Sequence, residues 1–202
     1  MMIKILLTSI FSFTIMTLFS QWNPNPTDSR LWNTTKSSFP QKINDIYIYS
    51  LKTDSNNYTA IITLQKIGDT IKFDYSIPEK PSHGKMMITA QANNNAIKYD
   101  TSFTENGEGS TTRSILWLSK KNMTELILLK ETVMDMGNGM ETFYKGRNSI
   151  IKVKFKGKEK IFTLYNAGNM KGNIHFSVLS DIRNPLIVNS VGPFNISLKE
   201  IR

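Results

Sequence analysis

Residues 149–165 read Ser-Ile-Ile-Lys-Val-Lys-Phe-Lys-Gly-Lys-Glu-Lys-Ile-Phe-Thr-Leu-Tyr, and this stretch indicates the fold class most strongly. Ile151, Val153 and Phe155 alternate with lysines, which is the period-two pattern of a strand with one buried face. A second alternating run follows Gly157. Two such runs around a short glycine-containing loop predict a β-hairpin.

The length of the hairpin loop decides which side chains share the buried face. An even loop places Phe162 and Leu164 with Ile151, Val153 and Phe155, whereas an odd loop places them on the lysine face. We therefore expect a two- or four-residue loop within residues 156–159, with these five apolar side chains facing inward together.

Short strands separated by turn residues are expected along the rest of the chain. The expected strands are residues 46–52, 58–66, 70–77, 85–91, 97–103, 114–119, 132–136, 140–145, 174–179, 186–189 and 194–201. Residues 93–95 are interpreted as a hairpin turn, and residues 105–112 as a polar, glycine-rich loop. The pattern predicts an all-β fold: an antiparallel barrel, half-barrel or sandwich of about ten short strands.

One segment has a helical pattern. Asn122, with Glu125 three residues later, resembles a capping box, and apolar residues follow at helical spacing. The alternative is one long strand over residues 125–136. We favour a short helix that ends at about Leu129, with at most one or two short helices in the whole chain.

The N-terminal residues have the pattern of a secretory signal peptide. Residues 1–20 contain one cation, Lys4, then an apolar run, then the small residue Ser20. The alternative is a membrane anchor, but the apolar run is shorter than the ~20 residues that a spanning helix needs. We expect cleavage near Ser20, a flexible arm over residues 21–42, and a single β domain over residues 43–202.

The composition limits the cellular compartments and the kinds of chemical site that are possible for this chain. The chain has no cysteine, which excludes disulfides, thiolate zinc sites and cysteine nucleophiles. Secreted eukaryotic domains of this size usually contain disulfides, so their absence favours a bacterial exported protein, periplasmic or extracellular. The net charge is +9, and for an exported protein anionic polymers are better partners than nucleic acid. No membrane span is expected after signal cleavage.

Four lysines of the hairpin are candidates for binding a polyanion: Lys152, Lys154, Lys156 and Lys158. The alternative interpretation is an ordinary solvent-facing strand, where lysines prevent pairing with other sheet edges. Both interpretations remain open at this point.

No motif of a known enzyme class is present. His83 and His175 lack a nearby nucleophile and orienting carboxylate in any recognisable arrangement, and no Gly-x-Ser-x-Gly elbow occurs. Asp135-Met-Gly137 resembles the aspartic protease motif only superficially, because Met136 replaces the hydroxyl residue. We therefore predict no catalytic residues and no cofactor, and we regard an enzyme as the minor hypothesis.

Methionines cluster near one hairpin, at Met134, Met136 and Met140, and Met86 and Met87 follow His83. Thioethers are soft ligands that suit Cu(I). Methionines also fill irregular gaps in sheet cores. We favour the second interpretation and predict no metal site.

Three segments resemble uncharacterised exported β-rich proteins of Gram-negative bacteria: residues 183–189, 196–201 and 119–123. The resemblance covers the last hundred residues or so of the chain. It implies an all-β exported domain and assigns no catalytic residue.

The sequence therefore predicts an exported, non-catalytic binding protein that holds an apolar or amphiphilic ligand against a curved sheet. The first alternative is a surface or matrix adhesion module that works through the lysine-rich strand face. The second is a hydrolase whose site has no recognisable motif.

Overall fold

The structure, a computed structural model, describes residues 41–53, 55–103, 106–110 and 112–202, without the side chains of residues 106–110. The expected signal peptide and nearly all of the expected arm lie outside the described residues. Within them, fourteen strands join one sheet and two short helices accompany it. The predicted all-β class is confirmed.

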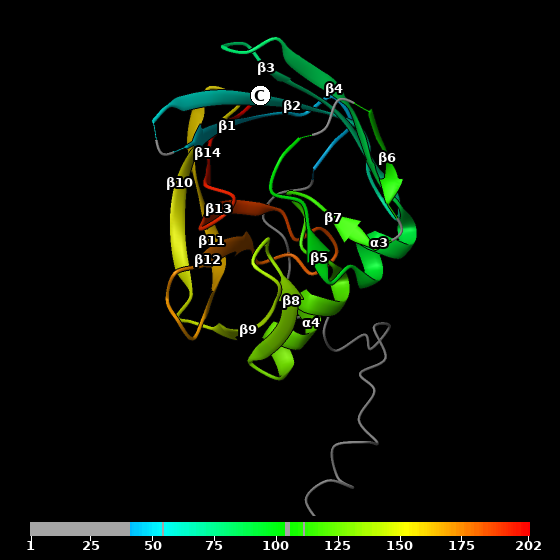
Figure 1. Cartoon of the computed structure of the whole chain (residues 1–202). Coiled ribbons are helices and arrows are strands. Elements are labelled where there is room, and N and C mark those ends of the chain that lie inside the picture. Colours follow the sequence, from blue (N-terminus) through cyan, green and yellow to red (C-terminus); the bar gives the residue numbers. More distant parts are fainter. Residues whose placement is uncertain (1–40, 54, 104–105, 111) are drawn as a thin grey trace, which may run out of the picture.

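The elements follow one another along the chain with short connections. They are β1 (Ile46–Lys52), β2 (Asn57–Lys66), β3 (Ile71–Ile77), β4 (Ser82–Ile88), α3 (Ala90–Asn95), β5 (Lys98–Tyr99), β6 (Asn106–Ser110), β7 (Arg113–Ser114), α4 (Lys120–Leu128), β8 (Glu131–Asp135), β9 (Met140–Lys145), β10 (Ser149–Phe155), β11 (Lys158–Asn169), β12 (His175–Leu179), β13 (Ile187–Val191) and β14 (Ile196–Ile201). Figure 1 shows them wrapped around a common interior.

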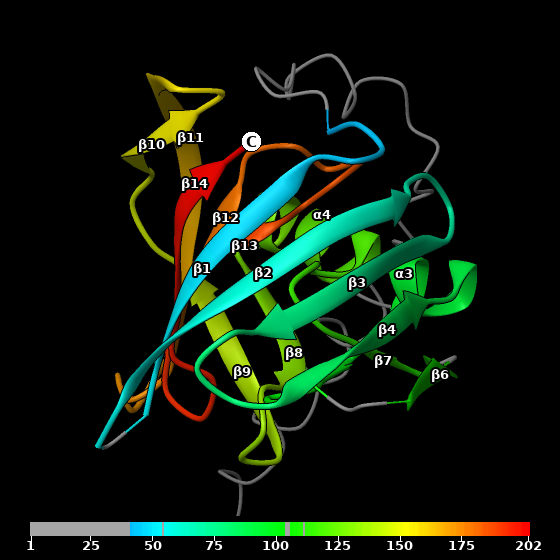
Figure 2. The same cartoon turned by 90° about the horizontal axis from the view of Figure 1, so that it is seen from above.

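Five strands, β10 to β14, close into a barrel, and the other strands extend the sheet outside it. The antiparallel ladder runs from β10 through β11, β12 and β13 to β14. A short parallel pairing of β10 with β14, at Lys154 opposite Glu200, closes the ring. The other edge of β14 continues into β1, β2, β3 and β4, which lie side by side in Figure 2.

The β10–β11 hairpin has the predicted register. Phe155 lies opposite Lys158, so the loop is the two-residue Lys156-Gly157. Both loop residues have positive φ, 47° and 83°, as a tight hairpin turn requires. The five apolar side chains face inward as expected: Val153, Phe162 and Leu164 are buried, and Ile151 and Phe155 are partly buried against the core.

The core gathers around Trp117, which is fully buried. Its ring lies 5.5 Å from that of Phe73 and 6.3 Å from that of Tyr47, in tilted and edge-on contacts. The hydroxyl of Tyr49, also buried, donates to the carbonyl oxygen of Ile187 at 2.9 Å. The hydrogen bond of Tyr49 thus connects β1 with barrel strand β13 across the core.

The prediction of a hairpin turn at residues 93–95 is wrong, because this segment is helix α3. The side chain of Thr89 caps it by accepting the Ala92 N–H at 3.2 Å. The amide of Asn93 donates to the carbonyl oxygens of Gly68 and Asp69 in the β2–β3 turn. The helix is therefore held by hydrogen bonds to a turn more than twenty residues earlier, which local sequence patterns cannot predict.

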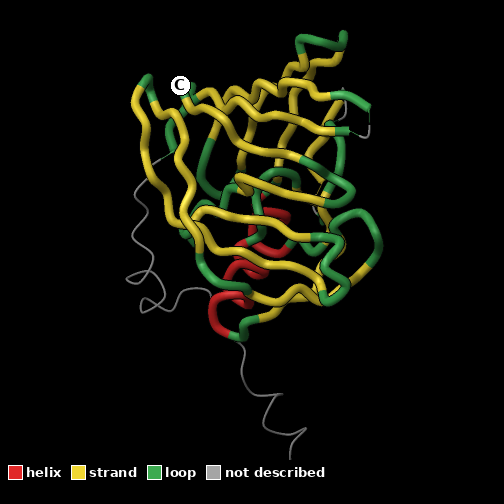
Figure 3. The backbone as a smooth tube through the Cα atoms, turned by 90° about the vertical axis from the view of Figure 1, so that its left-hand side faces the viewer, coloured by secondary structure: helices red, strands yellow, loops and turns green. Residues whose placement is uncertain are grey.

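Helix α4 confirms the expected short helix, but its cap differs from the prediction. Ser119, not Asn122, is the N-cap, and its side chain accepts the Asn122 N–H at 3.2 Å. Asn122 is instead a fully buried residue of the first turns. Both helices lie on the side of the molecule away from β10 and β11 (Figures 1 and 3).

Two further expectations change in the same region. Residues 114–119 are buried as predicted but are not one strand: Leu116 has a φ of 61°, and only an isolated bridge joins Trp117 to Leu186. Residues 106–110, expected as part of a loop, form β6 and pair in parallel with β4. Both differences reflect pairing with distant partners, which overrides weak local preference.

Candidate ligand-binding pocket

A pocket of about 250 Å³ opens where several strand connections meet. It is lined by residues 51–53 at the end of β1, by Tyr58 on β2, by residues 101–103 and 193–195, and by Ile77, Lys80 and Ser82, which are the last residue of β3, a residue of the β3–β4 connection and the first residue of β4. Segments far apart in the sequence therefore form it. Its volume is somewhat below the roughly 300–1,000 Å³ of pockets for drug-sized ligands, which suits one ring with a short chain.

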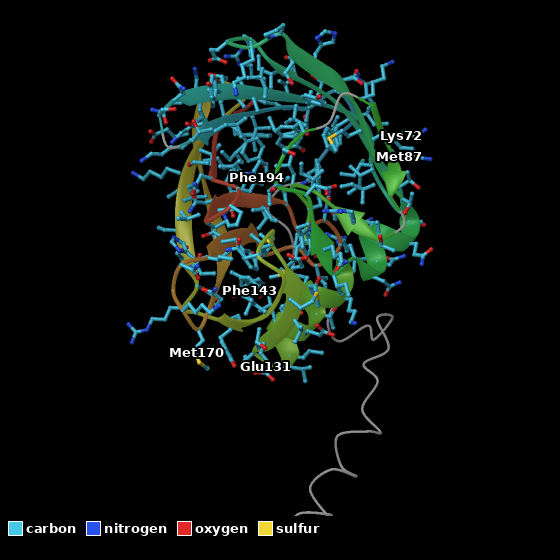
Figure 4. All side chains as sticks on the ribbon, in the orientation of Figure 1. Lys72, Met87, Glu131, Phe143, Met170 and Phe194 are labelled. Atoms are coloured by element: carbon cyan, nitrogen blue, oxygen red, sulfur yellow. The ribbon has the colours of Figure 1, made fainter. Side chains whose placement is uncertain are left out.

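Aromatic side chains form much of the wall. The ring of Phe103 stacks on that of Tyr75, with centroids 4.9 Å apart and an interplanar angle of 21°. Phe194 meets Phe103 edge-on at 6.0 Å. Figure 4 shows Phe194 within the curve of the sheet, well inside the outline of the molecule. Phe103 and Phe194 are each partly exposed, so their rings offer an apolar surface to a ligand.

Polar groups border this apolar wall. The ammonium group of Lys80 lies 3.9 Å from the centroid of the Tyr58 ring, a cation–π contact. Asn195 lines the pocket, and its Oδ1 accepts the Gly192 N–H at 3.0 Å. The remaining polar group of that amide is Nδ2, a donor. The pocket thus combines apolar rings with a few oriented polar groups, as small-molecule sites do.

The connections that form the pocket are held in place by specific contacts. The carboxylate of Glu79, in the β3–β4 connection, accepts the Thr59 N–H at 3.0 Å, and this hydrogen bond holds the pKa of Glu79 below its usual value. The β8–β9 turn packs against the opposite wall. A Cβ added at Gly137, whose φ is 106°, would lie 2.7 Å from Thr101 Cγ2 and 3.0 Å from Pro193 Cβ.

Tyr75, behind Phe103, carries a buried hydroxyl group. The residue is 2% exposed, and its hydroxyl has no hydrogen-bond partner among the described residues. Leaving such a group unsatisfied costs about 1–3 kcal/mol. The unpaired hydroxyl therefore lowers the stability of the fold at a residue whose ring stacks on Phe103 in the pocket wall.

The four candidate lysines do not share one face of the hairpin. The register places Lys152 and Lys154 on the outer face and Lys158 on the face of Phe155, while Lys156 lies in the turn. Two of them have carboxylate neighbours: Lys154 Nζ lies 3.6 Å from Glu200, and Lys156 Nζ lies 3.4 Å from Asp45. Binding of a polyanion by these lysines remains a prediction.

The methionines divide between core and surface. Met134 is buried on the inner face of β8 and Met136, just after the end of β8, is also buried, whereas Met140 is 49% exposed and lies opposite Asp135 on the outer face. These three side chains therefore do not converge on one side of the hairpin. Within the described part of the chain, no group of three or more histidine, cysteine or acidic residues could hold a metal ion.

The two histidines are exposed and lie on separate strands. His83 is on β4, which begins three residues before the expected strand 85–91, and it pairs with Ser76 of β3. His175 begins β12 and pairs with Val191 of β13. Neither His83 nor His175 lines the pocket at the strand connections.

A second hollow, also of about 250 Å³, lies at the surface where β9 meets the end of β11. Its polar groups already bind one another. Glu141 accepts hydrogen bonds from Lys171 at 2.9 Å and from Asn169 at 2.7 Å. The bond from Lys171 is the main reason that the pKa of Glu141 is lowered. This arrangement ties two strands together and leaves little for a ligand to recognise.

No sequence pattern indicates the pocket directly. Phe103 was expected at the end of a strand, and Phe194 at the start of another, with no indication that the two rings meet. The gaps between the expected strands 70–77 and 85–91, and between 186–189 and 194–201, contain two of these connections, but the contacts between connections are long-range.

Comparison with protein-family models, with curated proteins and with solved structures finds no match to this chain. None of the helices in the described ranges has the length and apolar character needed to cross a membrane.

Proposed function

We propose that the protein is an exported, non-catalytic binding protein that holds a small apolar or amphiphilic molecule in the pocket at the strand connections. The observation that carries this proposal is the partly exposed pair of rings, Phe103 and Phe194, in a hollow with polar groups at its border. Export is proposed from the signal-like N-terminal residues 1–20.

The construction of the pocket wall supports binding rather than simple core packing. Rings that only fill a core are covered on all sides, as Phe73 and Phe143 are here. Phe103 and Phe194 instead keep one side open to the hollow while Tyr75 supports Phe103 from behind. Burying that open apolar surface under a ligand is favourable at about 25 cal/mol per Å².

A calorimetric titration with phenylpropanol, a neutral molecule with one ring and a short polar-ended chain, tests the proposal. We expect saturable binding to the wild-type protein and a loss of affinity of about tenfold or more in Phe194→Ala, because truncation removes apolar contact area. Phe194 is partly exposed, so this variant is expected to remain folded.

Ile161→Ala is the matched control. Ile161 is 54% exposed on the outer face of β11 and does not line the pocket. Its truncation should leave phenylpropanol binding unchanged. Absence of binding to the wild-type protein, or equal binding by Phe194→Ala, would refute the proposed function.

A further inference from the structure

We infer that the ligand of this pocket carries an anionic group, which binds at Lys80 while the apolar part of the ligand covers Phe103 and Phe194. This inference rests on the proposed function and specifies its ligand class as an organic acid with a ring or short chain. Three observations on the described residues lead to it.

The first observation is the position of the Lys80 ammonium group. It lies over the ring of Tyr58, 3.9 Å from the centroid, and both residues line the pocket. The cation–π contact holds the charge at the border of the apolar wall, where an anionic end of a bound molecule would lie. An ammonium group so placed offers three donors to a carboxylate.

The second observation is the charge balance of the lining. Lys52 also lines the pocket, and no described lining residue is acidic. Neither lysine forms an ion pair with a carboxylate among the described residues. The nearest acidic neighbour of Lys80 along the chain is Glu79, and its carboxylate is directed at the Thr59 N–H. In the part of the chain that the structure describes, no carboxylate competes with a ligand for the two cations.

The third observation is that the side-chain amide of Asn195 presents a donor. Its Oδ1 is occupied by the Gly192 N–H, which fixes the orientation of the amide and leaves Nδ2 without a hydrogen-bond partner among the described residues. Its backbone carbonyl oxygen is also occupied, by the Lys52 N–H at 3.0 Å. A donor and two cations in the lining of one pocket favour a ligand oxygen that bears negative charge.

A charge series of matched ligands tests the inference. Phenylpropionate, phenylpropanol and phenylpropylamine share a ring and a chain of the same length but end in an anion, a neutral group and a cation. We expect phenylpropionate to bind about tenfold more tightly than phenylpropanol and phenylpropylamine to bind most weakly. The advantage of phenylpropionate should shrink as salt is added, because these lysines are exposed.

In Lys80→Gln the affinity for phenylpropionate should fall to about the affinity of the same variant for phenylpropanol, so that the preference for the anion is lost. Lys72→Gln is the control, since it removes the same charge from an exposed position of β3 outside the pocket, and Figure 4 shows Lys72 at the outer edge of the molecule. It should keep the wild-type preference for the anion.

The two proposals fail in different ways. If the three ligands bind with equal affinity, or Lys80→Gln keeps the preference for the anion, the inference about Lys80 is wrong while the pocket remains a ligand site. If none of the three ligands binds, the proposed function itself is refuted, and the inference falls with it.

Discussion

Asn122 shows how a residue identified from sequence can have a different role in the fold. It was expected to cap α4, but its side chain lies in a buried network beneath that helix. Its Oδ1 accepts from the hydroxyl of Tyr99 at 2.7 Å, and its Nδ2 donates to Thr132 Oγ1 at 2.6 Å. Burial raises the pKa of Tyr99, so this phenol stays protonated and able to donate.

Replacing Asn122 with Ala should destabilise the protein by about 1–3 kcal/mol, because the buried Tyr99 and Thr132 hydroxyl groups each lose the hydrogen bond to this side chain. Urea unfolding monitored by circular dichroism measures this cost. Lys121→Ala, at the adjacent exposed position of the same helix, should change stability by no more than about 0.5 kcal/mol. Equal costs for the two variants would show that the network contributes nothing beyond helix propensity.

Glu79 predicts a pH dependence of stability. Its pKa is lowered chiefly by the hydrogen bond from the Thr59 backbone N–H, so the ionised carboxylate stabilises the folded state. That stability is fully present above the usual glutamate pKa of 4.5 and is lost as the pH falls through the lower native value. Wild type should therefore exceed Glu79→Gln in urea midpoint at neutral pH, and the gap should narrow below about pH 4.5.

The same experiment has a clear opposite outcome. A gap between the two proteins that stays constant down to pH 3 would mean that the Glu79 carboxylate does not stabilise the fold through its charge. Direct NMR titration of the Glu79 side chain would then give a pKa at or above the usual value.

At the scale of the element, the β10–β11 hairpin was the most predictable part of the chain. Alternation of apolar residues with lysines sets the inward face, and the glycine at position 157 suits the positive φ of the turn. Helix α3 and strand β6 were not predicted. Each depends on a partner distant in sequence: the β2–β3 turn for α3 and β4 for β6.

The register of this hairpin predicts a sharp contrast between two adjacent residues of β11. Phe162 is 2% exposed and Ile161 is 54% exposed. Phe162→Ala should therefore cost about 3–5 kcal/mol, whereas Ile161→Ala should stay within about 0.5 kcal/mol. Urea unfolding measures both costs: the midpoint should fall with the loss of stability, while the slope of the unfolding free energy against urea concentration should stay unchanged. Similar costs at both positions would contradict the register.

At the scale of the whole molecule, local patterns predicted the class of fold and missed the pocket. Period-two patterning and turn residues suffice for strands, because both depend on neighbours along the chain. The pocket depends on how separate connections meet around the barrel and its extended sheet. Lys158 and Met140 were chosen as candidates for their chemical type alone. Neither of them lines the pocket.

The proposed function is tested most directly by mapping where a ligand binds on the protein. We would add phenylpropionate to isotope-labelled protein and follow the backbone amide signals by NMR. We expect saturable shifts concentrated at residues 51–53, 101–103 and 194–195 and at Tyr58 and Lys80. Shifts that concentrate instead on the outer face of β10, around Lys152 and Lys154, or that do not saturate at any position, would contradict the assignment of this pocket as the binding site.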